Sequence, residues 1–157
     1  MAHIEGEIMI ERPVDEVFDF VADERNEPRY NPRMVLAEKT SPGPVGLGTT
    51  FTARTMTMGR PVDMTIETTG YERPRRLKSS TVLSNMAIHG TLSFDARPGG
   101  TLMRWCWDVQ PHGLLKLMTP LIARQGKRQE EVIWTGLKHY LESGGDSASG
   151  TADRMLA

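Results

Sequence analysis

The sequence predicts an α+β fold in which a run of antiparallel strands is followed by one long helix near the C-terminal end. Between residues 33 and 110, short segments that alternate apolar and polar residues are separated by clusters of glycine and proline, as in consecutive β-hairpins. From residue 113 to residue 141, apolar residues recur every three or four positions, as they do on one face of an amphipathic helix. Strands followed by a single long helix are typical of an α+β domain.

The first 33 residues predict one more strand and two short helical segments. Residues 2–11 alternate, with Ile4, Ile8 and Ile10 on one side of a half-buried strand. Pro13 stands where helices commonly begin, and residues 14–21 carry an apolar stripe, so we expect a short helix there. The next segment, DERNEPRYNP, is polar and interrupted by two prolines, and we expect a loop that contains one turn of helix.

The middle of the chain predicts six strands, near residues 33–40, 48–58, 61–71, 75–83, 86–95 and 101–110. Successive side chains of a strand point to opposite faces, so the parity of each segment identifies its inner face. In the last strand, for example, Trp105 and Trp107 oppose Cys106 and Asp108. The pair of tryptophans is either a stacking platform for a ring-shaped ligand or part of the core.

The long helical segment is expected to bend near Thr119, because Pro120 cannot continue a helix from the preceding turn. Residues 124–131 hold seven polar or charged side chains and Gly126, so the apolar stripe is interrupted there. Two interpretations are open. Either this part of the helix faces solvent, or it covers a partly open cavity toward which Gln125 and Gln129 point.

Length and composition favour one domain, which we place at residues 1–143, followed by a small, polar tail over residues 144–157 that we expect to be disordered. The 19 basic residues against 20 acidic ones give no basic excess, which argues against nucleic acid as a partner. No apolar run is long enough for membrane insertion, and the first residues lack the pattern of a secretion signal. With Cys106 as the only cysteine, a cytoplasmic location is expected. Nothing in the sequence specifies an oligomeric state.

Motifs for catalysis, metals or cofactors are missing from the sequence. The four histidines are scattered, and neither HExxH nor CxxC occurs, so we predict no metal and no cofactor. The GxSxG motif of serine nucleophiles is missing too, and Cys106 falls on the outward parity of its strand. No catalytic residue is assigned.

Several stretches resemble the START-like, or helix-grip, superfamily, also called SRPBCC, and within it the polyketide cyclase/dehydrase and lipid-transport family. IERPVDEVFDFVAD followed by PRYNP is similar to that family's first helix and the loop after it, and VGLGTTF to its third-strand opening. YERPRRL resembles its hairpin, GGTLMRWCWDV its seventh strand, and LLKLMTPLIARQGKRQ the start of its closing helix. The resemblance covers about residues 3 to 142, with the motifs in the family's order.

The resemblance implies a curved, seven-stranded antiparallel sheet wrapped around the long C-terminal helix, with two short helices between strands 1 and 2 and an apolar cavity between sheet and helix. Tyr30, in the loop, either gates the cavity or covers the core. The residues expected to line the cavity are Tyr30, Phe51, Met64, Ile66, Ser79, Thr81, Met86, Ile88, Met103, Trp105, Trp107, Met118, Leu121, Ile122, Gln125 and Gln129.

Three functions are consistent with this resemblance. The first is binding of a small hydrophobic molecule, such as a lipid, an isoprenoid or an aromatic polyketide. The second is a polyketide cyclase or dehydratase that uses the same cavity. An enzyme of this kind requires a buried ionisable group that faces the cavity, and the inward parity of the strands supplies none. The third is a protein-interaction module, which an apolar patch around Leu102 and Cys106 on the outer face would favour.

Overall fold

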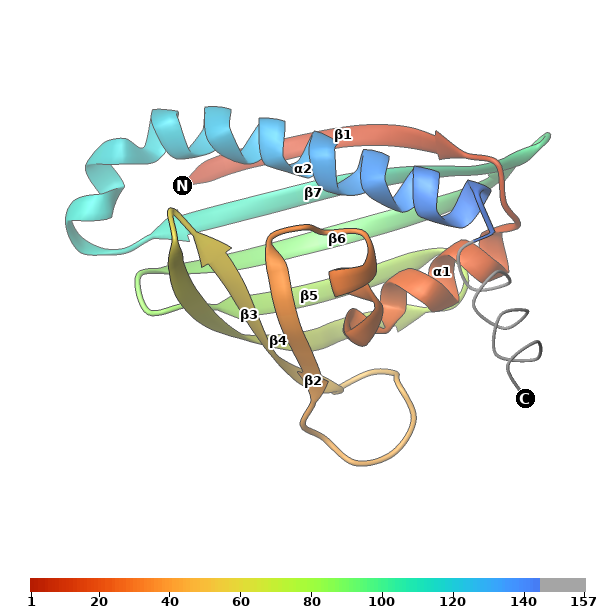
Figure 1. Cartoon of the computed structure of the whole chain (residues 1–157), viewed down its shortest axis with the longest axis horizontal. Helices are drawn as coiled ribbons and strands as arrows, with labels where there is room; N and C mark the ends of the chain where they lie inside the picture. Colours follow the sequence, from red (N-terminus) through yellow and green to blue (C-terminus); the bar gives the residue numbers. More distant parts are fainter. Residues whose placement is uncertain (145–157) are drawn as a thin grey trace.

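The structure, a computed structural model, describes residues 1–144 and forms one antiparallel sheet with a long helix against it (Figure 1). The seven strands lie in the order β1-β7-β6-β5-β4-β3-β2. In chain order the elements are β1 (Ala2–Ile10), α1 (Val14–Ala22), the 3-10 helix η1 (Glu24–Arg29), β2 (Met34–Lys39), β3 (Thr50–Thr57), β4 (Arg60–Glu72), β5 (Arg76–Val82), β6 (Met86–Arg97), β7 (Gly100–Pro111), the 3-10 helix η2 (Gly113–Met118) and α2 (Thr119–Glu142).

The predicted α+β fold and the order of its elements are confirmed. Each of the six predicted central strands is present, and the long helical segment divides at Thr119 into η2 and α2, with Pro120 in the first turn of α2. Pro120 is tolerated there because the first backbone N–H groups of a helix have no partner within it. The predicted disordered tail lies, apart from Gly144, outside the described residues.

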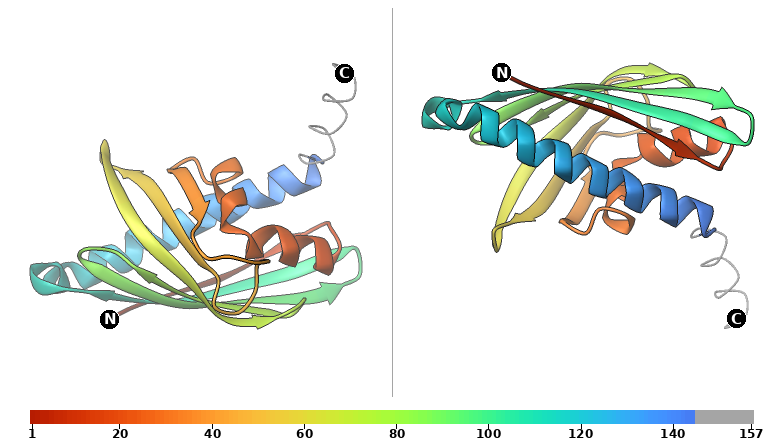
Figure 2. Two further views of the ribbon diagram at one scale, coloured as in Figure 1. Left: turned by 90° about the horizontal axis from the view of Figure 1, so that it is seen from below. Right: turned by 90° about the horizontal axis from the view of Figure 1, so that it is seen from above.

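The sheet is strongly curved, and α2 lies on its concave side. Figure 2 shows β2, β3 and β4 bending away from β1, β7 and β6 toward the side that α2 occupies. Because β1 pairs with β7, the first and last strands are neighbours, and α2 runs along β1. The helix-grip architecture expected from the resemblance is therefore present, and it leaves the middle of the sheet facing the inner side of α2.

The main core lies where α1, the end of α2 and the inner face of the sheet meet. Phe18 of α1 is fully buried, and its ring makes edge contacts with Tyr71 and Phe94 at centroid distances of 5.2 Å. Trp134 and Leu137 of α2 belong to the same cluster. Burial of a side chain the size of Phe18 contributes about 2–3 kcal/mol, so this cluster holds the C-terminal half of α2 against the sheet.

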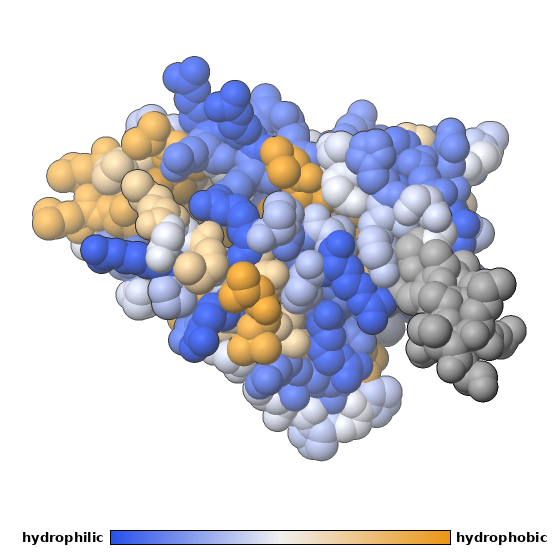
Figure 3. Space-filling model, viewed as in Figure 1, coloured by the Kyte–Doolittle hydropathy of each residue, from blue (hydrophilic) through white to orange (hydrophobic). Residues whose placement is uncertain are grey.

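The N-terminal part of α2 and η2 are packed much less tightly. Leu114 and Leu117 are 86% and 82% exposed, and Figure 3 shows apolar side chains gathered over this end of the molecule, at the left of the view. The outer face of the sheet around Leu102 and Cys106 instead carries charged groups, among them the ion pair of Arg104 with Glu7. Among the described residues, no helix is both long enough and apolar enough to cross a membrane.

Candidate functional site

A cavity of about 150 Å³ lies between the middle of the sheet, η1 and the inner side of α2. The strands supply apolar walls and two hydroxyl groups, whereas η1 and α2 supply the charged groups. The lining residues are Val21, Glu24, Glu27, Tyr30, Met34, Met64, Ile66, Leu77, Ser79, Thr81, Ile88, Leu92, Trp107, Glu130, Ile133 and Trp134.

Glu130 is the charged residue that α2 presents to this cavity. Its Oε2 atom accepts two hydrogen bonds, from the indole Nε1–H of Trp107 at 2.8 Å and from that of Trp134 at 2.7 Å. An indole nitrogen can only donate, so both tryptophans need an acceptor at this point, and one carboxylate oxygen serves both. Glu130 thereby connects α2 to β7 across the cavity.

Trp107 can reach Glu130 because its strand neighbour is Gly90. The two residues are directly paired between β6 and β7, and a Cβ atom at position 90 would lie only 1.5 Å from Cε3 of Trp107. The indole ring therefore lies across the backbone of β6 where any side chain would stand. Gly90 makes the room in which Trp107 forms part of the cavity wall.

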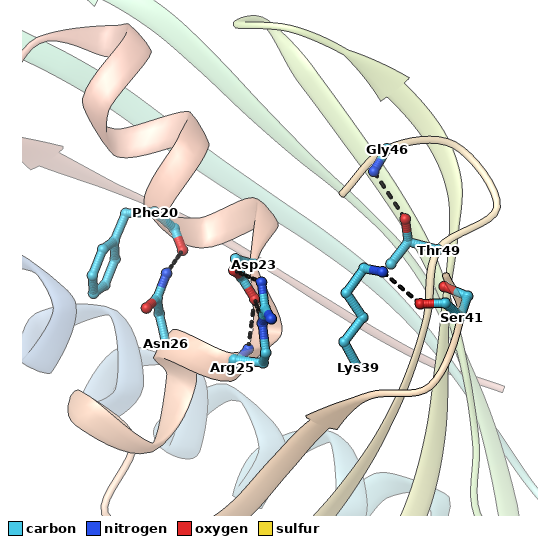
Figure 4. Close-up of polar contacts among 8 residues, drawn as sticks. All are labelled: Phe20, Asp23, Arg25, Asn26, Lys39, Ser41, Gly46 and Thr49. Carbon is cyan, nitrogen blue, oxygen red and sulfur yellow. Dashed lines mark hydrogen bonds and ion pairs between the residues drawn. The ribbon is translucent and has the colours of Figure 1, made fainter. Parts of the chain in front are cut away.

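The 3-10 helix η1 brings Glu24 and Glu27 to the cavity, and Tyr30 follows directly after it. Its position is fixed by local hydrogen bonds (Figure 4): the Asn26 side-chain amide donates to the Phe20 carbonyl at 3.0 Å, and Asp23 accepts from the backbone N–H of Arg25 at 3.1 Å. The helix α2 passes close to the residue that follows η1: a Cβ atom at Gly136 would lie 2.5 Å from the carbonyl oxygen of Tyr30. The end of η1 is thus held against α2.

Burial changes the acidity of three groups in this cavity. Loss of solvation raises the pKa of Glu130 to about 7, although the hydrogen bonds from Trp107 and Trp134 favour its ionised form. Burial also raises the pKa of Glu24 well above its usual range, and the neighbouring Glu27 adds charge repulsion and a hydrogen bond in the same direction. The pKa of Tyr30 is raised well above its usual value by burial and by the nearby carboxylates. The site therefore contains a carboxyl group, Glu130, that exchanges its proton near neutral pH.

A family model described as polyketide cyclase/dehydrase and lipid transport matches residues 1–142 of the sequence. The match extends over nearly the whole described chain, from the first strand of the sheet to the end of α2. The chain belongs to the polyketide cyclase/dehydrase and lipid transport family. Membership of this family implies a cavity for a hydrophobic ligand. Among curated proteins, none matches the sequence significantly.

Several solved structures have the same fold as this protein, although their sequence identity to it is low. A START superfamily protein from Mycobacterium smegmatis is similar with a TM-score of 0.79 at 12% identity, over 91% of this chain and 99% of that one. TTHA0849 from Thermus thermophilus is similar with a TM-score of 0.75 at 16% identity, over 90% and 98%. The di-domain ARO/CYC BexL from the BE-7585A biosynthetic pathway is similar with a TM-score of 0.75 at 22% identity, over 90% of this chain and 47% of that one. The START-like fold suggested by the sequence is confirmed.

Seven of the sixteen residues that the sequence suggested for the cavity line it, and nine lie elsewhere. Those at the cavity are Tyr30, Met64, Ile66, Ser79, Thr81, Ile88 and Trp107. Phe51, Met103 and Trp105 are buried in the core, and Met86 and Ile122 pack in a separate apolar cluster around Ile4. Met118 and Leu121 are 47% and 51% exposed. Gln125 is exposed and Gln129 half-buried, and neither lines the cavity.

The carboxyl groups of the cavity were not found from the sequence. The strands supply no ionisable side chain to it, as their parity predicts, but α2 supplies Glu130 and η1 supplies Glu24 and Glu27. Helical spacing contains a signal for Glu130, since it precedes Trp134 by four residues and Leu137 by seven, and both of these are buried. No comparable signal exists for Glu24 and Glu27, because the segment that holds them is short and has no apolar periodicity.

Among the described residues, one group that could hold a metal ion lies outside the cavity, on the outer face of β1 and β7. His3, Glu5 and Cys106 bring ligand atoms within 4.8 Å of one another, and His3 and Glu5 are exposed. The ring nitrogens of His3 already lie 2.9 Å from a carboxylate oxygen of Asp108 and 3.1 Å from one of Glu5. These hydrogen bonds explain why the three side chains lie close together on the surface without a metal ion. That the protein binds no metal stays a prediction.

Proposed function

We propose that this protein binds a small hydrophobic molecule in the cavity between the sheet and α2. The observation that carries the proposal is a chamber of about 150 Å³ whose strands supply apolar walls and whose charged groups come only from η1 and α2. Apolar walls with a few placed polar groups are the usual composition of a small-molecule site. We propose that the protein performs this function in the cytoplasm, the location expected from its single cysteine.

The size of the cavity favours a compact guest over a long lipid chain. A cavity of roughly 150 Å³ is known to accept a single aromatic ring such as benzene. Burial of about 200 Å² of apolar ligand surface would contribute about 5 kcal/mol before the costs of association. Apolar contact alone therefore gives weak binding, and the polar groups of the cavity must add both affinity and orientation.

Filling the cavity should abolish binding without unfolding the protein. Ser79 lines the cavity in the middle of β5, and Ser79→Leu would place a branched apolar side chain there. We expect ring-sized guests to bind this variant at least about tenfold more weakly, measured by quenching of tryptophan fluorescence, because Trp107 and Trp134 line the same cavity.

The matched control for this variant is Ser80→Leu. Ser80 is the next residue of β5 and points to the opposite face of the sheet, so the same substitution there adds the same apolar volume outside the cavity. Equal affinities of the Ser79 and Ser80 variants for the guest would contradict binding in this cavity.

A second candidate function is acid–base catalysis on a polyketide-like substrate, and Glu130 is the observation that favours it. A buried carboxyl group with a pKa of about 7 is suited to accept and return a proton at neutral pH. In an aldol cyclisation, Glu130 would accept a proton from the carbon between two carbonyl groups. The resulting enolate would attack the carbon of another carbonyl group further along the chain, and the alkoxide formed would take the proton back from Glu130.

This candidate predicts that the protein accelerates ring closure of a linear poly-β-ketone thioester, followed by mass spectrometry. Glu130→Gln keeps an oxygen for the two indole N–H groups but removes the base, so it should bind the substrate normally and lose most of the acceleration. A general base contributes about a hundredfold or more to the rate. If the wild-type protein produces no acceleration over buffer, catalysis is excluded for this substrate class and the binding function is left as it was.

A further inference from the structure

The acidic and basic side chains that line the cavity are all carboxyl groups. Glu24 and Glu27 come from η1 and Glu130 comes from α2, whereas the strands contribute only apolar residues, Ser79 and Thr81, and the Trp107 indole. No lysine, arginine or histidine is among the lining residues. Three carboxyl groups thus share a cavity that supplies no opposite charge.

Within residues 1–144, the chain does not pair these carboxyl groups with its own cations. None of the three takes part in an ion pair across that range. Arg25, on η1, pairs with Asp23 at 2.7 Å instead, and its side chain is half exposed. Buried charges are ordinarily paired, because an unpaired charge in a medium of low dielectric is costly. Their hydrogen-bond donors are neutral: the indoles of Trp107 and Trp134 for Glu130, and the side-chain amide of Asn31 for Glu27 at 2.8 Å. A cation that enters the cavity would supply the opposite charge.

Aromatic rings border the same cavity. Tyr30, Trp107 and Trp134 line it together with Glu130, and the rings of Tyr30 and Trp134 lie 6.1 Å apart. The face of an aromatic ring attracts a cation within about 6 Å, and tryptophan does so most strongly. Carboxyl groups beside tryptophan and tyrosine rings therefore favour an organic ammonium group over a neutral or anionic one.

We propose that the guest of this cavity is a small hydrophobic amine: an ammonium group directed at Glu130, Glu24 and Glu27, attached to an apolar body about the size of one aromatic ring. The inference rests on the proposed binding function and specifies the chemical class of the ligand. Carboxylic acids and phosphates of the same size are excluded from the site, because the cavity surrounds an anion with carboxyl groups and offers it no basic side chain.

Binding of an amine should strengthen as the pH rises through neutrality. The groups that face Glu130 are Glu24 and Glu27 of η1 and Tyr30, and the strands around the cavity add no titratable side chain. Below the pKa of Glu130, near 7, an ammonium group must displace a proton in order to bind, and above it the carboxylate is already formed. The affinity should therefore rise by about tenfold from pH 6 to pH 8, with proton release in the lower part of this range.

Three probes of nearly equal size and different charge test the inference: 2-phenylethylamine, 2-phenylethanol and phenylacetate. Isothermal titration at pH 8 should give the order amine, alcohol, phenylacetate, with the amine at least about tenfold tighter than the alcohol and phenylacetate unbound. An alcohol or phenylacetate that binds as tightly as the amine would overturn the inference and leave the binding function standing. If none of the three binds and neutral ring-sized compounds also fail, both the inference and the binding function are wrong.

Variants identify the groups responsible. At pH 8, Glu130→Gln should weaken amine binding by about tenfold and leave 2-phenylethanol binding unchanged, because it removes the carboxylate that pairs with the ammonium group. Glu131→Gln removes the same charge from the next, exposed residue of α2, and it should leave both affinities unchanged. Loss of amine affinity in Glu131→Gln equal to that in Glu130→Gln would show that net charge, not the cavity, attracts the amine.

Discussion

Replacement of Gly90 with alanine should lower the free energy of unfolding by about 3 kcal/mol and move Trp107 out of its position. A Cβ atom at position 90 would lie 1.5 Å from Cε3 of Trp107 and 1.9 Å from Cζ3, distances that no rearrangement of the methyl group can relieve. The indole ring must rotate away from β6. It would then lose its hydrogen bond to Glu130, leave one wall of the cavity open and weaken the contact between β7 and α2.

Urea denaturation and the emission spectrum of the tryptophans measure these two effects together. Gly46→Ala is the matched control, because Gly46 lies in the loop between β2 and β3, where an added Cβ would have no atom within 4 Å and the backbone is not left-handed. The control should unfold at the wild-type urea concentration and emit the wild-type spectrum. A Gly90→Ala protein that matches it in both would contradict the position of Trp107 across β6.

The second large effect is a dependence of stability on pH that Glu130 causes. Its pKa is about 7 in the folded protein and near 4.5 in the unfolded chain, so between these values the folded state holds the proton more often. The contribution of this group to stability is therefore fully present below pH 4.5 and is lost as the pH rises through 7. A pKa difference of about 2.5 between the two states corresponds to roughly 3 kcal/mol.

Glu130→Gln removes this dependence while it preserves an acceptor for Trp107 and Trp134. The difference in free energy of unfolding between the variant and the wild type should therefore move in favour of the variant by about 3 kcal/mol from pH 4.5 to pH 8. Taking the difference cancels the other groups that titrate, among them Glu24 and His3, whose pKa values are also raised. Glu131→Gln should show no such trend. A flat difference for Glu130→Gln would mean that Glu130 is solvated in the folded protein.

The order of strands and helices was predictable from the sequence because these elements have strong local patterns, whereas the curved sheet wrapped around the long helix followed from the family resemblance. Strand parity placed Met64, Ile66, Ser79 and Thr81 on the face that lines the cavity, since alternation along a strand fixes the face of every residue once one is known. Clusters of glycine and proline between the segments marked where the strands end. These features depend on neighbours in the chain and require no knowledge of the packing.

The site on α2 was harder to predict because a helix has no such fixed alternation. The interrupted apolar stripe left open whether residues 124–131 face solvent or a cavity, and the residues suggested for the cavity were Gln125 and Gln129. In the structure most of this segment is exposed, and Glu130 is the residue of it that lines the cavity. The buried positions Trp134 and Leu137 set the phase, and counting back four residues from Trp134 gives Glu130. The apolar residues of η2 illustrate the same difficulty: Leu114 and Leu117 continue the amphipathic pattern, yet both side chains are exposed.

A crystal structure of the protein with the tightest-binding of the three phenylethyl compounds tests the central claim most directly. The claim predicts electron density for the ring between Trp107 and the apolar side chains of β4 and β5, with the polar end of the ligand within hydrogen-bonding distance of Glu130. Density only on the surface, or Trp107 and Ile133 in direct contact across a closed interior, would contradict it.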